Sequence, residues 1–390
     1  MNIINEEKKN KILYISFNQD NSCFSIGTEK GFIVYETYPI KNKYEKKMDG
    51  GIKYTEMLYQ TNILALVGGG EIPKFNPRKL IIWDDYEDKM VCEIKFFSNI
   101  KNVKLKKETI FVICEKNIYL FDLKSFENIE IIQTRDNPKG LFGINIDLNK
   151  TIIAYMEVFD KGNNNHKGSV MIKNYEKEKG IQFIAQEDSI SYISLNNSGT
   201  LLASSNEKGT LIKIHSCING DLLSQFKRGK EKAEINYICF DKLSYYLAVT
   251  SDRGTIHIWS LGEVAEKLKN IQEEEEDIKK IDQDNNEDEN IDEDENNENK
   301  ININKNENKQ ENKEIYNTNN LPRNKKTIFG QAEKSFAQIR INSSKSICSF
   351  QKNNIIVIVT YEGIYYQAQL DTKIGGNCKI IFEDSLSNLK

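Results

Sequence analysis

A tyrosine and a glycine separated by 17 positions recur three times along this 390-residue chain. The pairs are Tyr14/Gly31, Tyr192/Gly209 and Tyr237/Gly254. The last two copies are offset by 45 residues, since Leu202 and Ala203 fall in register with Leu247 and Ala248. Each glycine ends a polar turn and precedes an apolar segment of strand length, where it can supply the positive φ of a tight hairpin turn. The chain therefore contains a β-repeat.

Short segments of alternating apolar and polar residues, rich in aromatic and β-branched side chains, run through most of the chain. Examples are 13–17, 31–35, 79–83 and 255–259. Four strands repeated about every 40–45 residues are typical of propeller blades, which bury their apolar faces against one another. Seven such units are present, at 10–47, 52–97, 100–135, 142–185, 190–227, 235–341 and 345–385. We therefore predict an all-β fold, a seven-bladed β-propeller of WD-type repeats.

The sixth unit is interrupted by a long polar segment. Its third strand should end near Leu261 and its fourth should lie at 335–341, with a stretch rich in Asn, Glu, Asp and Lys between them. Such a stretch cannot bury enough apolar surface to fold, so we predict a long disordered acidic insertion in blade six. Closing so long a loop costs only roughly 2–3 kcal/mol more than closing a short turn. The predicted parts are the propeller blades at 1–262, the insertion at 263–330, and the end of blade six with blade seven at 331–390.

Charge is divided unevenly between the insertion and the rest of the chain. Residues 271–300 contain 15 acidic and three basic side chains, a net charge of −12. The whole chain carries −4, so the remainder carries +8. A basic folded body favours an anionic partner. We do not expect nucleic acid to be that partner, because Lys and Arg are not clustered with interleaved aromatic side chains.

Both edges of the insertion carry apolar residues. Val264, Leu268 and Ile271 would share one helical face for barely two turns. The other edge mixes basic and apolar residues, as interfacial membrane segments do. Its residues are Arg323, Lys325, Lys326, Ile328 and Phe329. We predict that this stretch inserts into a membrane surface; the alternative is that the whole insertion is a spacer.

Several classes of protein are excluded by what the sequence lacks. No run of 18 apolar residues could span a bilayer, and the first eleven residues lack the apolar core of a secretory signal. The seven cysteines form no CxxC pair and lie mostly in apolar runs, which indicates buried free thiols in the reducing cytosol. Only three histidines occur, and no catalytic or nucleotide-binding motif is found. We therefore predict no enzyme activity, no cofactor and no metal site.

A basic dipeptide marks the end of the last strand of the fifth unit. Adjacent side chains on a strand point to opposite faces, so Lys227 and Arg228 should face the grooves on either side of this blade. The flanking repeats supply Lys208 and Thr210 for one groove, and Ser251, Arg253, Thr255 and His257 for the other. Hydroxyls, cations and an imidazole together suit a phosphate, whose oxygens accept charge-assisted hydrogen bonds. The sequence thus predicts two neighbouring phosphate-binding sites.

Residues Phe226–Gly229, with the sequence Phe-Lys-Arg-Gly, resemble the Phe-Arg-Arg-Gly motif of the PROPPINs, autophagy-related seven-bladed propellers of the WIPI type. Residues 17–35 are similar to the first blade of that family, and residues 64–85 are similar to its second blade. Residues 335–338 look like the strand that follows its membrane-inserting loop. The resemblance covers nearly the whole chain outside about 263–325.

The resemblance implies a peripheral membrane scaffold that acts in autophagy and membrane trafficking. Its ligands would be phosphatidylinositol 3-phosphate, the 3,5-bisphosphate, or both, on autophagic precursor, endosomal or vacuolar-type membranes. One headgroup site would contain Lys227, Lys208 and Thr210, and the other would contain Arg228, Ser251, Arg253, Thr255 and His257. The first site departs from the family pattern, because Lys227 replaces an arginine, Asn206 a serine and Gln186 a histidine.

The resemblance also implies a protein partner, the lipid-transfer protein of autophagosome growth. In the family a turn equivalent to the one holding Asn18 and Asp20 contacts this partner; the alternative is that both residues only stabilise the turn. We expect a cytosolic protein that is a monomer in solution. A second interpretation of the whole chain is a lipid-independent WD-type propeller that organises a protein complex, and liposome binding would separate the two.

Overall fold

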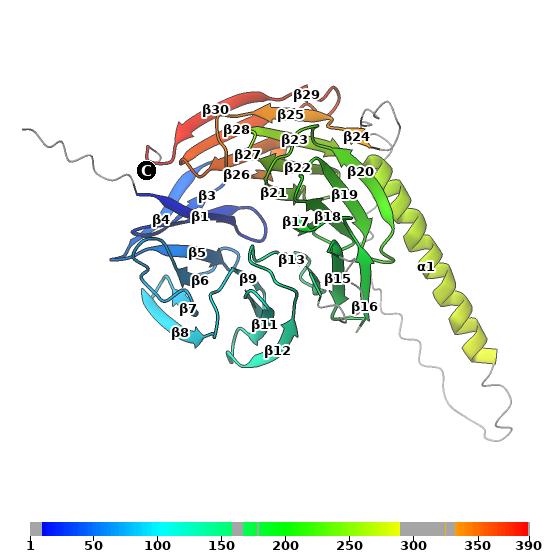
Figure 1. Cartoon of the computed structure of the whole chain (residues 1–390), viewed down its shortest axis with the longest axis horizontal. Helices are drawn as coiled ribbons and strands as arrows, with labels where there is room; N and C mark the ends of the chain where they lie inside the picture. Colours follow the sequence, from blue (N-terminus) through cyan, green and yellow to red (C-terminus); the bar gives the residue numbers. More distant parts are fainter. Residues whose placement is uncertain (1–9, 158–166, 178, 289–323, 325–331, 389–390) are drawn as a thin grey trace, which may run out of the picture.

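The computed structural model describes residues 10–157, 167–177, 179–288, 324 and 332–388. In this part of the chain, seven mainly antiparallel sheets are arranged around a central axis (Figure 1). Within each sheet the first strand in sequence lies closest to the axis, and the chain adds strands outward from it. The predicted seven-bladed propeller is therefore confirmed.

The first four blades are continuous in sequence. Blade one comprises β1 (Ile12–Phe17), β2 (Cys23–Thr28), β3 (Gly31–Glu36) and β4 (Lys41–Lys47). Blade two comprises β5 (Ile52–Met57), β6 (Ile63–Gly68), β7 (Lys79–Asp84) and β8 (Lys89–Lys95). Blade three comprises β9 (Asn102–Lys106), β10 (Thr109–Ile113), β11 (Asn117–Asp122) and β12 (Asn128–Gln133). Blade four comprises β13 (Gly143–Ile144), β14 (Ile152–Tyr155), β15 (Ser169–Asn174) and β16 (Lys179–Ile184).

The last three blades exchange short strands. Blade five comprises β17 (Ile190–Leu195), β18 (Leu201–Asn206), β19 (Leu211–Ser216) and β20 (Leu222–Lys227), with β24 (Glu333–Lys334) added in parallel to β20. Blade six comprises β21 (Ile235–Phe240), β22 (Tyr246–Ser251), β23 (Thr255–Ser260) and β25 (Ala337–Arg340), with β29 (Gly376–Asn377) added in parallel to β25. Blade seven comprises β26 (Ser346–Phe350), β27 (Ile355–Thr360), β28 (Ile364–Gln369) and β30 (Lys379–Ser385), with a short 3₁₀ helix at Lys352–Asn354.

The blades are held together by apolar cores at the seven interfaces between neighbours. Strand alternation supplies these cores, because each blade buries apolar side chains on both of its faces. Between blades five and six, the fully buried rings of Phe226 and Trp259 stack with their centroids 5.4 Å apart. The ring of blades closes between blades seven and one, where the Tyr365 hydroxyl donates to the carbonyl of Thr37 at 2.7 Å.

The repeat register changes within blades five and six. Ser204 pairs with Lys213 in blade five, whereas Val249, which lies 45 residues after Ser204, pairs with His257 in blade six. Equivalent residues of the two blades are therefore 45 positions apart on the second strands and 44 positions apart on the third strands. The extra residue lies in the turn of blade five around Gly209, whose φ of 60° and contact with the carbonyl of Ala233 require a glycine. Lys213 is thus the structural counterpart of His257.

The first part of the insertion differs from the prediction, because a helix, α1 (Gly262–Asp288), follows blade six. Val264 and Leu268 are buried in the core between blades five and six, and Ile271 packs against the same core. Their i, i+4 and i+7 spacing gives the helix an apolar stripe to dock, and Lys267 also donates to the carbonyl of Leu223 at 2.5 Å. The helix begins beside β20 and then extends away from the propeller (Figure 1). The other predicted parts of the insertion, 289–323 and 325–330, lie outside the described residues.

Candidate functional site

The basic dipeptide lies where β20 ends at the rim of blade five. Phe226 points into the core between blades five and six. Lys227 is therefore on the opposite face, where it pairs across the sheet with Leu211. That face looks towards blade four, because Lys213, two residues further along β19, forms an ion pair with Glu187 at 3.5 Å. Lys227 thus faces the groove between blades four and five, called the first groove below.

Arg228 lies in the groove between blades five and six, called the second groove below. The residue is 7% exposed, and its guanidinium donates from Nε to the carbonyl of Gly209 at 2.6 Å and from Nη2 to the carbonyl of Glu231. Burial lowers the pKa of Arg228, and the nearby charges of Asp252 and Arg253 act in opposite directions on it. The arginine is therefore held rigidly at the groove rather than extended into solvent.

His257 lies near Arg228, on the face of blade six that packs against blade five. The imidazole stacks on Trp259 with centroids 5.7 Å apart, and its Nδ1 is 3.2 Å from the hydroxyl of Ser335. Burial, assisted by the positive charge of Arg228, lowers the pKa of His257 to about 4. At neutral pH this histidine can donate one hydrogen bond but supplies no charge.

The remaining residues predicted for the second groove flank the turn between β22 and β23. Ser251 is buried, and its hydroxyl has no hydrogen-bond partner among the described residues. Thr255 is half-buried. Arg253 is exposed, donates to the carbonyl of Lys232 at 3.0 Å and forms an ion pair with Glu231 at 3.3 Å. The structure thus brings two guanidinium groups, an imidazole and two hydroxyls to one groove.

The first groove differs in character from the second. Lys208 is exposed at the turn between β18 and β19 and forms an ion pair with Asp188 at 3.2 Å, and Thr210 is half-buried in the same turn. Gln186 is buried and donates to both the carbonyl and the hydroxyl of Ser204 at 2.9 Å, so its amide nitrogen already has protein partners. Fewer buried donors therefore remain for an anion here.

Two further lysines near the first groove were missed by sequence reasoning. Lys213 shares the face of Lys227, and its side chain is only 13% exposed. Lys334 pairs in register with Lys227 through the parallel strand β24, which places both side chains on the same face. The 45-residue offset matches Lys213 to Ile258, so the register change hid it, and no sequence signal predicts the pairing of β24.

The turn after β1 holds Asn18 and Asp20. Asn18 is 3% exposed; its amide donates to Ser22 and to the carbonyl of Tyr59, and its carbonyl oxygen accepts from the amide of Cys23. Asp20 is exposed and accepts from Ser22. The geometry of Asn18 favours the turn-stabilising alternative. Contact with a protein partner stays a prediction for both residues.

The predicted membrane-inserting residues Arg323, Lys325, Lys326, Ile328 and Phe329 lie outside the described residues. Asn324 is described between them, and its side chain bonds both the amide and the carbonyl of Ser260 in blade six. Among the described residues, no helix has the length and apolar character needed to cross a membrane.

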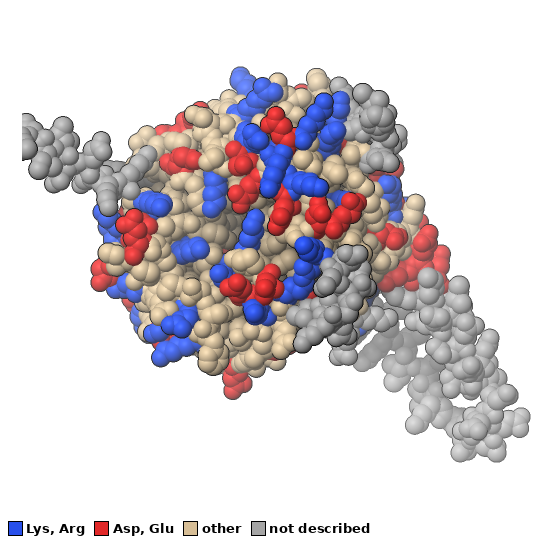
Figure 2. Space-filling view, in the orientation of Figure 1, with Lys and Arg blue, Asp and Glu red and all other residues tan. Residues whose placement is uncertain are grey.

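Diffuse charge does not single out an anion site on the face shown in Figure 2, because basic and acidic side chains are interspersed over it. A cavity of about 440 Å³ lies elsewhere, along the propeller axis, and none of the residues of either groove lines it. Selectivity for an anion in the grooves would therefore rest on directed donors.

Comparisons with known proteins agree with this architecture. The PROPPIN family profile matches residues 12–277. SVP1-like protein 2 of Candida glabrata is 33% identical over 66% of this chain and 64% of its own length, so less than two thirds of that relative is matched. Autophagy-related protein 18 of Yarrowia lipolytica is 28% identical over 96% of both chains.

Solved structures show the same fold over almost the whole chain. Kluyveromyces lactis Hsv2 has a TM-score of 0.67 at 21% identity, covering 97% of this chain and 99% of that one. A complex of KlAtg21 with the coiled-coil of AgAtg16 has a TM-score of 0.69 at 20% identity, covering 96% and 99%. Since the family profile spans more than half of the chain, this protein belongs to the autophagy-related PROPPIN family of seven-bladed propellers.

Proposed function

We propose that this protein is a non-catalytic, phosphoinositide-binding scaffold of autophagic and related membranes, with phosphatidylinositol 3-phosphate or the 3,5-bisphosphate as its ligand. The second groove carries the proposal, because a buried, oriented arginine lies there beside a neutral imidazole and a buried hydroxyl without a partner. A phosphate offers only acceptors, so a site made of donors complements it.

The two grooves would act together. A headgroup in the second groove would accept from the guanidinium of Arg228, from Ser251 and Thr255, and from His257. A headgroup in the first groove would interact mainly with the ammonium groups of the lysines, which supply charge without a planar donor fork. Because both grooves flank the same blade, binding at one raises the effective concentration of lipid at the other.

Membrane contact and protein recruitment complete the proposal. The basic and apolar stretch at 323–329 would add interfacial insertion next to the grooves. The name of the Yarrowia lipolytica relative supports a role in autophagy. The KlAtg21 complex with a coiled-coil supports recruitment of protein partners by such propellers, and Asp20 is the exposed residue we assign to a lipid-transfer partner.

Liposome co-sedimentation tests the proposal directly. Wild-type protein should pellet with liposomes containing phosphatidylinositol 3-phosphate and not with otherwise identical plain liposomes. Lys227→Thr/Arg228→Thr should lose this binding. Lys89→Thr/Lys95→Thr, which also removes two positive charges, at exposed positions of β8, should retain it. Chemical unfolding of each variant establishes that the loss is not caused by misfolding.

The alternative function, a lipid-independent scaffold, predicts a different result. Equal pelleting of wild-type protein with plain and phosphoinositide liposomes, or full binding by a folded Lys227→Thr/Arg228→Thr protein, would refute the proposed lipid site. In that case the propeller surface would serve protein partners alone.

A further inference from the structure

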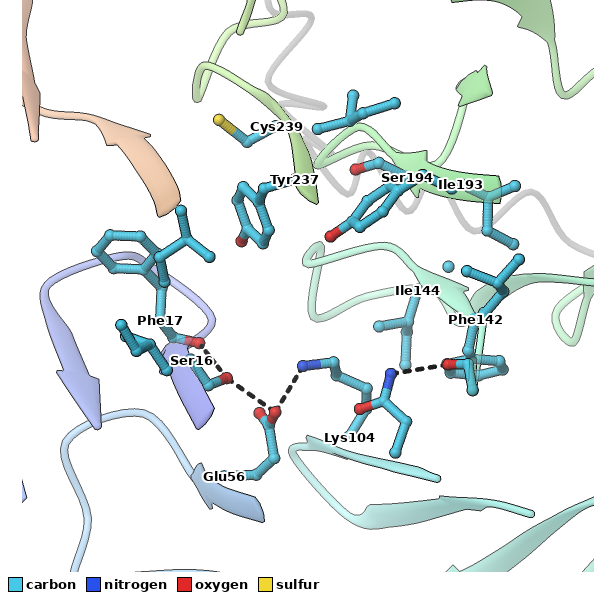
Figure 3. A pocket seen from close by; sticks show the side chains of 18 of the residues that line it. Ser16, Phe17, Glu56, Lys104, Phe142, Ile144, Ile193, Ser194, Tyr237 and Cys239 are labelled. Carbon is cyan, nitrogen blue, oxygen red and sulfur yellow. Dashed lines mark hydrogen bonds and ion pairs between the residues drawn. The ribbon is translucent and has the colours of Figure 1, made fainter. Parts of the chain in front are cut away.

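The cavity along the propeller axis is lined by residues from all seven blades, mostly from the innermost strands. Its volume of about 440 Å³ lies within the range of small-molecule sites, roughly 300–1,000 Å³. Figure 3 shows side chains from different blades pointing into it, with Glu56 bridging Ser16 and Lys104. The headgroup grooves lie at the outer side of blade five, so this cavity is a separate place in the fold.

Positive charge is concentrated in this cavity. Six lysines and two glutamates line it, a formal charge of +4 in a chain whose total is −4. The lysines are Lys53, Lys101, Lys104, Lys106, Lys139 and Lys345, and the glutamates are Glu56 and Glu234. Low-dielectric walls focus such a field on the space they enclose, so an anion would be attracted there.

Four of these lysines lie at one mouth of the cavity. Lys101, Lys139 and Lys345 precede the innermost strands β9, β13 and β26, and Lys53 is the second residue of β5. Because the innermost strands all run in the same direction along the axis, their first residues meet at the same end. Glu234, which precedes β21, adds one acidic side chain at this mouth and forms an ion pair with Lys139 at 3.6 Å. Glu115 forms a second ion pair, with Lys101 at 3.7 Å.

Two of the mouth lysines have no carboxylate partner among the described residues. Lys53 lies over the ring of Tyr54 at 4.9 Å, and Lys345 lies over the ring of Tyr361 at 4.0 Å. Burial lowers the pKa of Lys345, and the nearby charge of Lys53 lowers it further, against an opposing effect of Glu234. The structure therefore holds two ammonium groups near each other, neither of them in an ion pair with a described residue.

The interior of the cavity also carries net positive charge, with Lys104 and Lys106 against Glu56. Lys106 donates to the backbone carbonyl and the side chain of Asn145 at 3.2 and 2.7 Å and to the carbonyl of Lys150 at 2.5 Å, so only neutral oxygens accept from it. Glu56 is the acidic side chain of the interior, and Lys104 and Ser16 already occupy its oxygen at 2.6 and 2.8 Å. Tyrosine hydroxyls from several blades line the same space.

From these observations we propose that the lysine-rich mouth of the axial cavity binds a compact soluble polyphosphate, such as an inositol polyphosphate or a short phosphate chain. The lysines come from four different blades around the axis, so a single phosphate could contact only some of them. A ligand with several phosphates can neutralise them together, because charge-assisted hydrogen bonds form at each one. This ligand is distinct from the membrane lipid of the grooves.

Calorimetric titration of the Lys227→Thr/Arg228→Thr protein, in which the grooves are disabled, tests the proposal. Inositol hexakisphosphate and pyrophosphate are titrated in separate arms to distinguish a ring of phosphates from a short chain. One equivalent of at least one of them should bind. Adding Lys53→Gln/Lys345→Gln should weaken binding about tenfold, as expected when two partly exposed charge pairs are lost.

Two control variants complete the experiment. Glu234→Gln should tighten binding severalfold, because it removes an acidic side chain that lines the mouth and releases Lys139. Lys41→Gln/Lys352→Gln, which removes two exposed charges outside the cavity, should leave the affinity unchanged. The opposite sign expected for Glu234→Gln cannot arise from a folding defect.

Three results would overturn the proposal. The first is that neither polyphosphate binds the protein with disabled grooves, whether or not wild type binds one of them. The second is equal affinity with and without Lys53→Gln/Lys345→Gln. The third is weaker binding by Glu234→Gln. None of these results bears on liposome binding by the grooves, so this inference and the proposed function can fail separately.

Discussion

Replacing Arg228 by alanine should destabilise the propeller as well as weaken anion binding. Arg228 is 7% exposed and its guanidinium donates to the carbonyls of Gly209 and Glu231, so its removal leaves two backbone acceptors without this donor. A hydrogen bond from a charged donor contributes about 1.5–3 kcal/mol. Relief of the buried charge, which is evident in the lowered pKa of Arg228, offsets part of the loss. We therefore expect the free energy of unfolding to fall by about 2 kcal/mol.

Two variants isolate the effect of burial. Arg253 also donates to a backbone carbonyl, that of Lys232, but its side chain is 50% exposed, so Arg253→Ala should cost less than about 1 kcal/mol. Lys227→Ala removes a half-buried side chain with no ion pair among the described residues and should leave stability unchanged. Urea unfolding followed by tryptophan fluorescence measures all three, because Trp259 lies in the core between blades five and six.

Headgroup binding by the same variants ranks the two grooves. Arg228→Ala should reduce the affinity for a soluble phosphoinositide headgroup more than Lys227→Ala does, because the second groove has the larger set of oriented donors. An Arg228→Ala midpoint equal to that of wild type would refute the structural role of the guanidinium. A larger loss of affinity at Lys227 would refute the ranking.

Three further predictions concern pH, the helix and the insertion. Because the pKa of His257 is about 4 in the folded state, the unfolded state binds more protons as pH falls from 6.5 to 4, and stability should fall over that window. His257→Gln should reduce this fall in the free energy of unfolding by about 3 kcal/mol, measured by urea titrations at several pH values across the window. An identical fall in wild type and variant would contradict the low pKa of His257. Val264→Ser/Leu268→Ser should free α1 from the propeller and speed its proteolysis, since each buried side chain contributes about 2–5 kcal/mol to docking; unchanged cleavage would argue against docking. Ile328→Ser/Phe329→Ser should weaken binding to phosphoinositide liposomes but not to a soluble headgroup, and equal liposome affinities would establish that the insertion is a spacer.

The fold was predictable because the blade is a local unit. Each unit forms its sheet from consecutive strands, so the spacing of turns and the alternation of apolar residues are enough to predict it. Gly31 and Gly254 adopt positive φ angles of 111° and 67° at the turns where the repeat places them. The register change near Gly209 was not predictable, because one extra turn residue leaves the apolar pattern of both flanking strands intact.

Contacts between segments distant in sequence account for the other features that the sequence did not predict. Lys334 reaches the side of Lys227 only because β24 pairs with β20 across an interval of about a hundred residues, and no periodicity records such a pairing. The helix α1 was underestimated for a related reason, since two apolar turns are marginal alone and become stable only on a core formed by other blades. Sequence likewise placed His257 in the second groove but could not give its stacking on Trp259 or the lowering of its pKa by burial and by the charge of Arg228.

The attachment of the insertion links the proposed membrane-inserting stretch to the proposed headgroup grooves. At one end α1 docks on the core between blades five and six, and at the other end β24 pairs beside Lys227. Asn324 adds a third attachment, because its side chain bonds both backbone groups of Ser260 at 2.9 and 2.7 Å. Residues 325–331 are therefore joined on both sides to residues fixed on the blades that form the second groove. A short tether of this kind keeps the effective concentration of the second contact high once the first has formed. Two individually weak contacts, a headgroup in the groove and an apolar stretch in the interface, would then hold the propeller on a membrane without any change in the conformation of its blades.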